Sequence, residues 1–123
     1  MSNNPVCWFE IYVQDMPRAR QFYESVLAIS LTLMPAGDLE MFAFPSNQEG
    51  QGTSGSLVRV TGMPSGGNST LVYFACMDCA LEASRVAAAG GRLHRDKFLI
   101  GEYGYCALAF DTEGNMFGLY SMQ

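Results

Sequence analysis

The sequence predicts an α+β fold in which two βαβββ modules form a curved mixed sheet with helices on its outer face. A strand, an aspartate-capped helix and three further strands are expected twice in the same order. The segment Pro64–Asn68 separates module 1, about 5–63, from module 2, about 69–122. With 49% hydrophobic and 15% charged residues in 123 positions, the chain is suited to one well-packed domain over 1–123.

The first expected strand is Val6–Val13, which is rich in β-branched and aromatic residues. Alternate positions divide it into an apolar face and a mixed face. The apolar face carries Cys7, Phe9, Ile11 and Val13, and the mixed face carries Val6, Trp8, Glu10 and Tyr12. We expect the apolar face to pack against helices and the mixed face to line water or a cavity.

A helix is expected after Asp15, which suits the N-cap, and Pro17 suits the first turn. Its apolar positions repeat at intervals of three and four: Met16, Ala19, Phe22, Tyr23, Val26 and Leu27. Strands are then expected at Ile29–Met34, Leu39–Phe44 and Ser56–Thr61. The polar loop Ser46–Gly55 is either a lid or a plain surface loop.

The same pattern begins again after the linker. We expect a strand at Thr70–Met77, a cap at Asp78, a helix at Cys79–Ala89 and a helix end at Gly90-Gly91. Further strands are expected at Arg92–His94, Tyr105–Phe110 and Met116–Met122, with a tight turn at Asp111–Asn115 between the last two.

Charge and hydropathy exclude several classes of protein. The net charge of −5 argues against nucleic acid as a partner. The longest apolar stretch, around Val26–Leu33, is too short to span a membrane, and no secretory signal precedes it. A cytoplasmic protein is therefore expected.

Four cysteines, Cys7, Cys76, Cys79 and Cys106, include one C-x-x-C pair. No second pair or histidine pair completes a zinc set. We interpret these cysteines as small buried or half-buried apolar side chains in a reduced compartment.

Two motifs carry a resemblance to a known group. Asp15 followed by Arg20–Glu24 resembles the D-x-x-x-A-x-x-F-Y stretch of the vicinal oxygen chelate superfamily, which includes glyoxalase I, bleomycin-resistance proteins and extradiol dioxygenases. Asp111–Asn115 resembles its D-P-x-G-N turn, with Thr112 replacing the proline. The resemblance runs from about Val6 to Tyr120. It implies paired βαβββ modules forming a cup, usually in a homodimer.

Enzymes of this superfamily hold a divalent metal with His and Glu side chains in the cup. Carried onto this chain, the ligand positions fall at Trp8, about Val72, Gly118 and either Val58 or Arg59. None of these binds a divalent cation, and His94 is the only histidine. We therefore expect no metal and no cofactor.

Glu10 is the candidate catalytic residue. Surrounded by aromatic side chains, it should be partly desolvated and could act as a base or as an anchor for a cation. Equally, it could be a structural glutamate paired with Arg59 or a tyrosine hydroxyl. The predicted ligand-binding set is Trp8, Glu10, Tyr12, Arg59, Val72, Phe74, Gly118 and Tyr120, with Gly118 opening space beside Trp8.

Three other residues have candidate roles. His94, between Arg92 and Arg95, is expected to be exposed on an edge strand. Tyr103 and Tyr105 could serve a dimer interface or a ligand.

The first hypothesis for function is metal-independent binding of a small organic molecule in an aromatic-lined cup, as in the bleomycin-resistance branch. The alternative is a lyase, isomerase or dioxygenase, either metal-free with Glu10 as base or with a non-standard metal site. A third hypothesis is a structural or regulatory domain with a filled cup.

Overall fold

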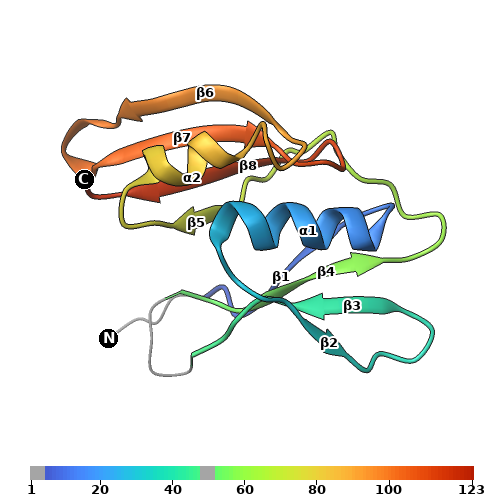
Figure 1. Cartoon of the computed structure of the whole chain (residues 1–123). Coiled ribbons are helices and arrows are strands. Elements are labelled where there is room, and N and C mark those ends of the chain that lie inside the picture. The colour runs from blue at the N-terminus through green and yellow to red at the C-terminus, as the bar shows by residue number, and fades with distance from the viewer. Residues whose placement is uncertain (1–4, 48–51) are drawn as a thin grey trace.

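The computed structural model describes residues 5–47 and 52–123, and each half of the chain forms one four-stranded sheet with one helix (Figure 1). The first half contains β1 (Phe9–Tyr12), α1 (Met16–Leu27), β2 (Thr32–Met34), β3 (Glu40–Ala43) and β4 (Gly55–Arg59). The second half contains β5 (Tyr73–Ala75), α2 (Cys79–Arg85), β6 (Arg92–Leu99), a short 3₁₀ turn η1 (Gly101–Tyr103), β7 (Tyr105–Phe110) and β8 (Met116–Ser121).

The two sheets have the same topology. Sheet A has the order β1-β4-β3-β2, and sheet B has the order β5-β8-β7-β6. In each sheet the first and last strands of the half pair in parallel and the other pairs are antiparallel. The predicted α+β fold of two βαβββ units is therefore confirmed.

Both helices begin at the predicted aspartates. The Asp15 carboxylate accepts a hydrogen bond from the Arg18 amide at 3.1 Å, and the Asp78 carboxylate accepts one from the Ala80 amide at 3.0 Å. These bonds satisfy amides that have no partner within a helix. α1 ends at Ala28, whose left-handed conformation, φ 55°, turns the chain back toward β2.

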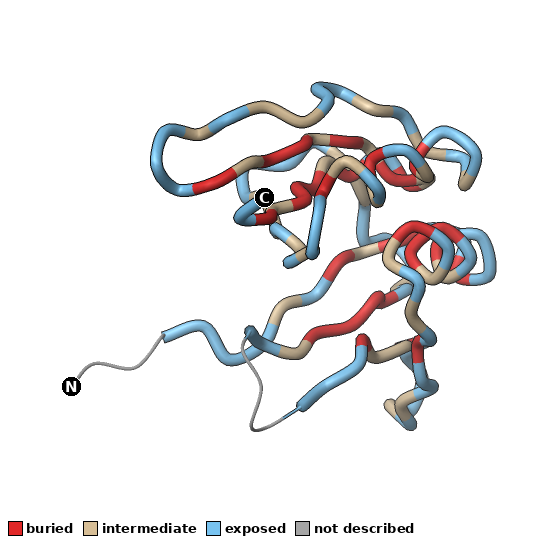
Figure 2. The backbone as a smooth tube through the Cα atoms, turned by 60° about the vertical axis from the view of Figure 1, so that its left-hand side comes forward, coloured by how far each residue is buried: buried red, intermediate tan, exposed pale blue. Residues whose placement is uncertain are grey.

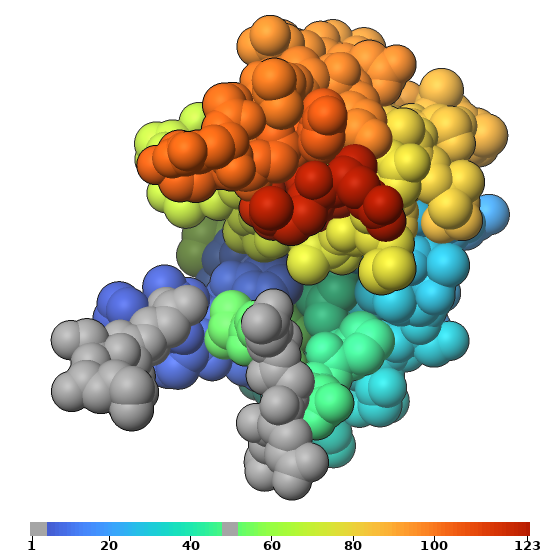
Figure 3. Space-filling view, turned by 90° about the vertical axis from the view of Figure 1, so that its left-hand side faces the viewer, coloured from blue at the N-terminus to red at the C-terminus, as the bar shows by residue number. Residues whose placement is uncertain are grey.

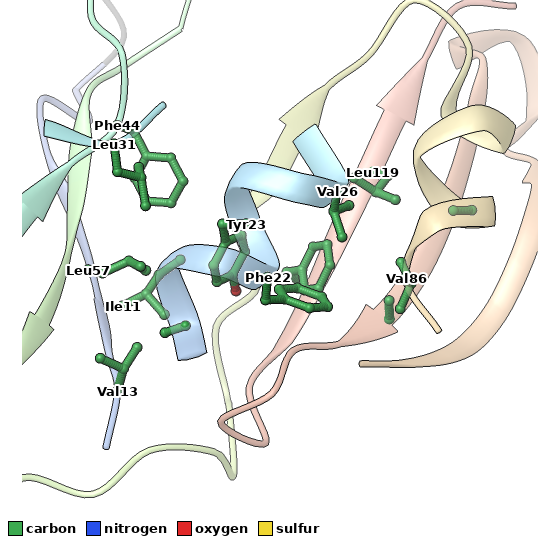
Figure 4. Packing of buried hydrophobic residues seen from close by; sticks show 14 of the residues in the cluster. Ile11, Val13, Phe22, Tyr23, Val26, Leu31, Phe44, Leu57, Val86 and Leu119 are labelled. Atoms are coloured by element: carbon green, nitrogen blue, oxygen red, sulfur yellow. The ribbon is translucent and has the colours of Figure 1, made fainter. Parts of the chain in front are cut away.

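α1 lies along the boundary between the two sheets (Figure 1). We call this boundary the seam. The Tyr23 ring contacts Phe44 from the first half and Phe74 and Phe117 from the second, with centroids 5.5 to 5.8 Å apart. The core therefore runs through both halves of the chain, as the labelled side chains in Figure 4 show. In Figure 2 the buried positions follow α1 and the strands that face it.

Several predicted boundaries were wrong. β6 extends to Leu99 instead of ending at His94, and it does so with two irregularities in its pairing to β7. α2 ends at Arg85, and β1 and β5 are shorter than predicted. Of the predicted loop Ser46–Gly55, residues 48–51 lie outside the described residues, so the lid remains a prediction.

The turn between β7 and β8 joins the halves through polar contacts. Asn115 donates to the Tyr12 carbonyl at 3.0 Å and accepts from the Gly66 amide at 2.6 Å. The Glu113 carboxylate accepts from the amides of Gln14 and Asp15 at 2.6 and 3.1 Å. The predicted tight turn thus fixes the linker and the end of β1.

Two remaining predictions concern cysteines and membranes. Cys79 and Cys106 are buried and Cys76 is half-buried, but Cys7 is exposed, because it precedes the paired part of β1. Across residues 5–47 and 52–123 no helix is long and apolar enough to cross a membrane. The cytoplasmic location remains a prediction.

Candidate functional site

The faces of the sheets that point away from α1 and α2 form the candidate site, and we call them the open faces. Strand pairing determines which side chains they carry. On sheet A, Glu10 lies opposite Ser56 and Tyr12 opposite Val58. On sheet B, Tyr73 lies opposite Gly118, and Ala75 lies opposite Tyr120.

Glu10 is held by two aromatic neighbours, Trp8 just before β1 and Tyr12 at its end. The Trp8 indole donates to Oε2 at 3.2 Å, and the Tyr12 hydroxyl donates to Oε1 at 2.8 Å. Burial and the charge of Glu10 add to this hydrogen bond in raising the pKa of Tyr12. The predicted desolvation of Glu10 is wrong, because its side chain is exposed. The predicted pairing with a tyrosine hydroxyl is present.

Arg59 does not contact Glu10. Its guanidinium reaches the Gln14 carbonyl at 3.2 Å and the Glu40 carboxylate at 4.0 Å. Arg59 lies opposite Glu40 on β3, and it therefore points away from the face that carries Tyr12 and Val58. This register resolves the alternatives left by the sequence: Val58 lies on the open face, where it is buried.

A pocket of about 220 Å³ opens at the seam beside Glu10. Its walls come from β1, from the linker and from the start of β8. The residues that line it include Glu10, Tyr12, Tyr23, Ser65, Gly66, Asn68, Val72, Asn115 and Met116. The pocket combines one carboxylate and two phenols with backbone and amide groups of the linker, which suits a polar end of an organic molecule.

Gly118 does not open the space that we expected beside Trp8. A Cβ atom at Gly118 would overlap the Tyr73 ring, because that ring lies directly over it. Tyr73 itself remains 49% exposed on the open face. The missing side chain of Gly118 therefore accommodates Tyr73 and leaves no cavity there.

The expected orientation of Phe74 was wrong by one residue. Phe74 pairs with Leu119 and packs against Phe44 and Phe117 in the core, with ring centroids 5.4 and 5.9 Å away. Tyr73 takes the open-face position instead. Counting back from the helix caps would have given the correct face. Glu10 and Tyr73 each lie five residues before the aspartate that caps the following helix. Val72, half-buried before β5, lines the seam pocket.

Tyr120 lies on the open face as predicted, but its hydroxyl is engaged locally. It donates to the Tyr103 carbonyl and lies 2.8 Å from the Met122 sulfur. Tyr103 is 68% exposed. The Tyr105 ring instead faces the core and lies 4.6 Å from the Lys97 ammonium. His94 is exposed on the edge strand β6, as predicted, against the ring of Phe110.

The open faces offer few donors for a divalent metal. On the four strands that flank the seam, β4, β1, β5 and β8, Glu10 is the only open-face carboxylate within the described residues. Both of its oxygens already accept hydrogen bonds. No group of three or more His, Cys, Asp or Glu residues in the described part of the chain is arranged to hold a metal ion. The residues therefore do not fit a divalent metal here.

Solved structures reveal what this arrangement resembles. A glyoxalase I mutant from Zea mays superposes with a TM-score of 0.75 at 23% identity, covering 95% of this chain and 46% of that one. A glyoxalase/bleomycin resistance protein from Albidiferax ferrireducens superposes at 0.70 with 20% identity, covering 96% and 99%. An antibiotic binding protein from Streptomyces superposes at 0.70 with 22% identity, covering 100% and 99%. The chain has the glyoxalase/bleomycin-resistance fold.

The chain shares this fold with the three solved structures although its sequence identity to them is only 20% to 23%. Neither a protein-family model nor a curated protein sequence matches the chain. It spans about half of the maize glyoxalase I chain, whereas the other two proteins have similar lengths. The fold predicted from Asp15, the following helix and the Asp111–Asn115 turn is thereby confirmed. The likeness applies to the fold, and the chemistry must be argued from the residues.

Proposed function

We propose that this protein binds a small organic molecule at the seam, without a catalytic metal, and that Glu10 anchors the ligand. The observation that supports this most strongly is the pocket of about 220 Å³ beside Glu10 and Tyr12. A carboxylate with aromatic neighbours at the mouth of a partly apolar pocket suits an organic ligand that carries a positive charge or a hydrogen-bond donor.

Trp8 and Tyr12 position the anchor in this proposal. Their hydrogen bonds, at 3.2 and 2.8 Å, restrict the rotation of the Glu10 carboxylate while its side chain stays exposed to an incoming ligand. Val72 supplies an apolar wall of the pocket. The other predicted contacts do not line this pocket: Arg59, Phe74, Gly118 and Tyr120. They would take part only if the ligand were larger and extended beyond the pocket.

The same geometry favours binding over acid–base catalysis. Carboxylates that act as general bases usually lie in a site that is closed to water. The Glu10 side chain is exposed, although each of its oxygens keeps a lone pair for a donor on a ligand. The antibiotic binding protein from Streptomyces, which has the same fold, offers a precedent for binding as the function of such a chain.

The single tryptophan allows a direct test. Because the Trp8 indole donates to Glu10, a ligand that engages the carboxylate should change Trp8 fluorescence. We would titrate the protein with a panel of cationic and neutral amphiphiles, with and without EDTA, and repeat the titration with Glu10→Gln. Saturable binding that is insensitive to EDTA and weakened in the variant supports the proposal. Binding lost in EDTA, or no saturable change with any compound, contradicts it.

We also propose that the protein is a homodimer. Leu99, Tyr103 and Met122 are each 61 to 68% exposed and gather at one end of sheet B, where Tyr120 contacts both Tyr103 and Met122. Exposed apolar clusters of this kind commonly mark interfaces. Light scattering after gel filtration should give twice the monomer mass, and Leu99→Lys with Met122→Lys should give the monomer. A monomeric parent protein contradicts the proposal.

A further inference from the structure

A second pocket, of about 350 Å³, lies at the other end of the seam. Figure 3 looks onto this end of the molecule, where the blue first strand, green residues near the end of β3 and yellow residues of the second half meet. The lining is mainly apolar and includes Phe9, Leu27, Ile29, Phe44 and Phe74, together with the carboxylate of Glu82 on α2.

Three phenyl rings form one side of this pocket. The centroid of Phe44 lies 5.4 Å from those of both Phe9 and Phe74, and Phe9 and Phe74 are 6.2 Å apart. The rings come from β1, from the residue after β3 and from β5, so both halves of the chain hold them in place. Ring faces grouped in this way attract cations as well as hydrocarbon.

Glu82 places a carboxylate at this apolar wall. Its Oε1 atom is buried, and within the described residues that atom accepts no hydrogen bond and Glu82 forms no ion pair. Arg85, one turn further along α2, donates to the Val26 carbonyl at 3.0 Å instead. The nearby Cys76 thiol stays neutral, because burial, then the charge of Glu82, and to a smaller extent a hydrogen bond to the Glu82 carboxylate raise its pKa to about 12. A buried carboxylate oxygen normally has a donor.

The repeat in the fold shows how unusual this acid is. Glu82 lies four residues after the cap Asp78, and the residue four after the cap Asp15 is Ala19. Ala19 is fully buried in the core. At the equivalent position the second half has an acid in place of a core alanine.

We propose that this pocket is a second ligand site, which takes a hydrophobic primary amine. The ammonium group would donate to the Glu82 carboxylate, which turns its buried oxygen toward the ligand on binding, and the hydrocarbon part would pack on the rings of Phe9, Phe44 and Phe74. Carboxylic acids are excluded by repulsion from Glu82. Neutral ligands would fill the apolar part of the pocket but would form a weaker hydrogen bond with the Glu82 carboxylate than an ammonium group does. This site is separate from the pocket beside Glu10, although Val72 lines both.

Calorimetric titration of the full chain at pH 7 with 4-phenylbutylamine and 4-phenylbutan-1-ol tests the proposal. We expect the amine to bind at least about tenfold more tightly than the alcohol, since a charge-assisted hydrogen bond is stronger than a neutral one. Glu82→Gln should remove that preference. The same change at Glu102, an exposed glutamate that lines neither pocket, should leave it intact.

Three results would overturn the second site: equal binding of amine and alcohol, an unchanged preference in folded Glu82→Gln, or loss of the preference in Glu10→Gln. The last result would place the amine in the first pocket. If Glu82→Gln does not fold, amide chemical shifts of the wild-type protein decide. Shifts at Leu27, Ile29 and Ala75 upon addition of amine support the site, and shifts confined to Ser65–Asn68 refute it. Failure of the Glu10 titrations leaves these outcomes unaffected.

Discussion

Tyr23 on α1 donates a hydrogen bond of 2.6 Å to the carboxylate of Asp111, in the turn between β7 and β8. Both residues are buried, and the bond joins the two halves of the chain through residues that are 88 positions apart in the sequence. Tyr23 also lines the seam pocket, so this contact helps to fix the wall of the proposed ligand site.

Tyr23→Phe should therefore destabilise the protein. Removing a partner of a buried charged group costs about 1–3 kcal/mol, and the phenyl ring would keep the aromatic contacts with Phe44, Phe74 and Phe117. Urea unfolding measures the loss. Tyr103→Phe, which removes an exposed hydroxyl, is the control and should change stability little. Equal stability of the two variants would show that the bond to Asp111 contributes nothing.

The two acids of the turn should respond to pH with opposite signs. Burial would raise the pKa of Glu113, but hydrogen bonds from Arg18 and from the amides of Gln14 and Asp15 outweigh it and lower the pKa below 4.5. The contribution of Glu113 to stability is then complete above pH 4.5 and is lost as the pH falls through its folded pKa. Burial raises the pKa of Asp111 above 3.8, more than its hydrogen bonds lower it.

Glu113→Gln tests the acid dependence. At pH 7 we expect a loss of about 2 kcal/mol in the free energy of unfolding, and the difference from wild type should shrink below pH 4.5. For Asp111→Asn the trend should reverse. As the pH falls, the free energy of unfolding of the wild type should rise relative to that of the variant, because Asp111 binds a proton more tightly in the folded state than in the unfolded state. Urea titrations from pH 3 to pH 7 supply both curves, and parallel curves for wild type and Glu113→Gln would contradict the first expectation.

Gly118→Ala should destabilise the protein through Tyr73. The added methyl group would overlap the Tyr73 ring, and moving a packed side chain costs about 1–3 kcal/mol. In the background of Tyr73→Ala the same change should cost little, since the ring is gone. The four free energies of unfolding form a double-mutant cycle. A coupling energy near zero would mean that the ring and Gly118 are not in contact in solution.

Ala28→Gly should stabilise the protein slightly. Ala28 has φ 55°, a conformation that costs alanine about 1 kcal/mol and glycine almost nothing. Part of this gain is offset by the greater freedom of glycine in the unfolded chain, so about 0.5 kcal/mol is expected. Thermal unfolding of Ala28→Gly beside Ser25→Gly, a change within α1 that should destabilise, distinguishes relief of strain from a general effect of glycine.

Local sequence signals predicted most of the fold. The two aspartate caps, the spacing of apolar residues in α1 and the alternation along β1 each depend on neighbouring residues, and the structure confirms them. The length of β6 was not predicted, because Arg92–Leu99 contains four charged residues and a histidine and has no regular alternation. Its strand is established by pairing with β7, a contact between distant parts of the chain.

The site was predicted less completely than the fold. The open-face positions of Trp8, Glu10 and Tyr12 followed from the period of two in β1. Phe74 was assigned to the wrong face because β5 has only three residues, and a register error of one reverses every side chain. The linker looked like a simple spacer, yet Ser65, Gly66 and Asn68 line the seam pocket. It is held there because the Gly66 amide donates to Asn115 and the Met116 amide donates to Asn68, and no local pattern reveals these bonds.

Glu113 has a consequence for the order of folding. α1 has no acidic residue in its own first turn, and the two amides just before it, those of Gln14 and Asp15, donate to a carboxylate that the chain supplies about a hundred residues later. A negative charge at a helix N-terminus is attracted by the positive end of the helix dipole and stabilises the helix. During synthesis the first half leaves the ribosome before this charge exists. We therefore expect the residues just before α1 to stay loosely held until β7 and β8 have paired, so that a segment made later fixes the start of a helix made earlier.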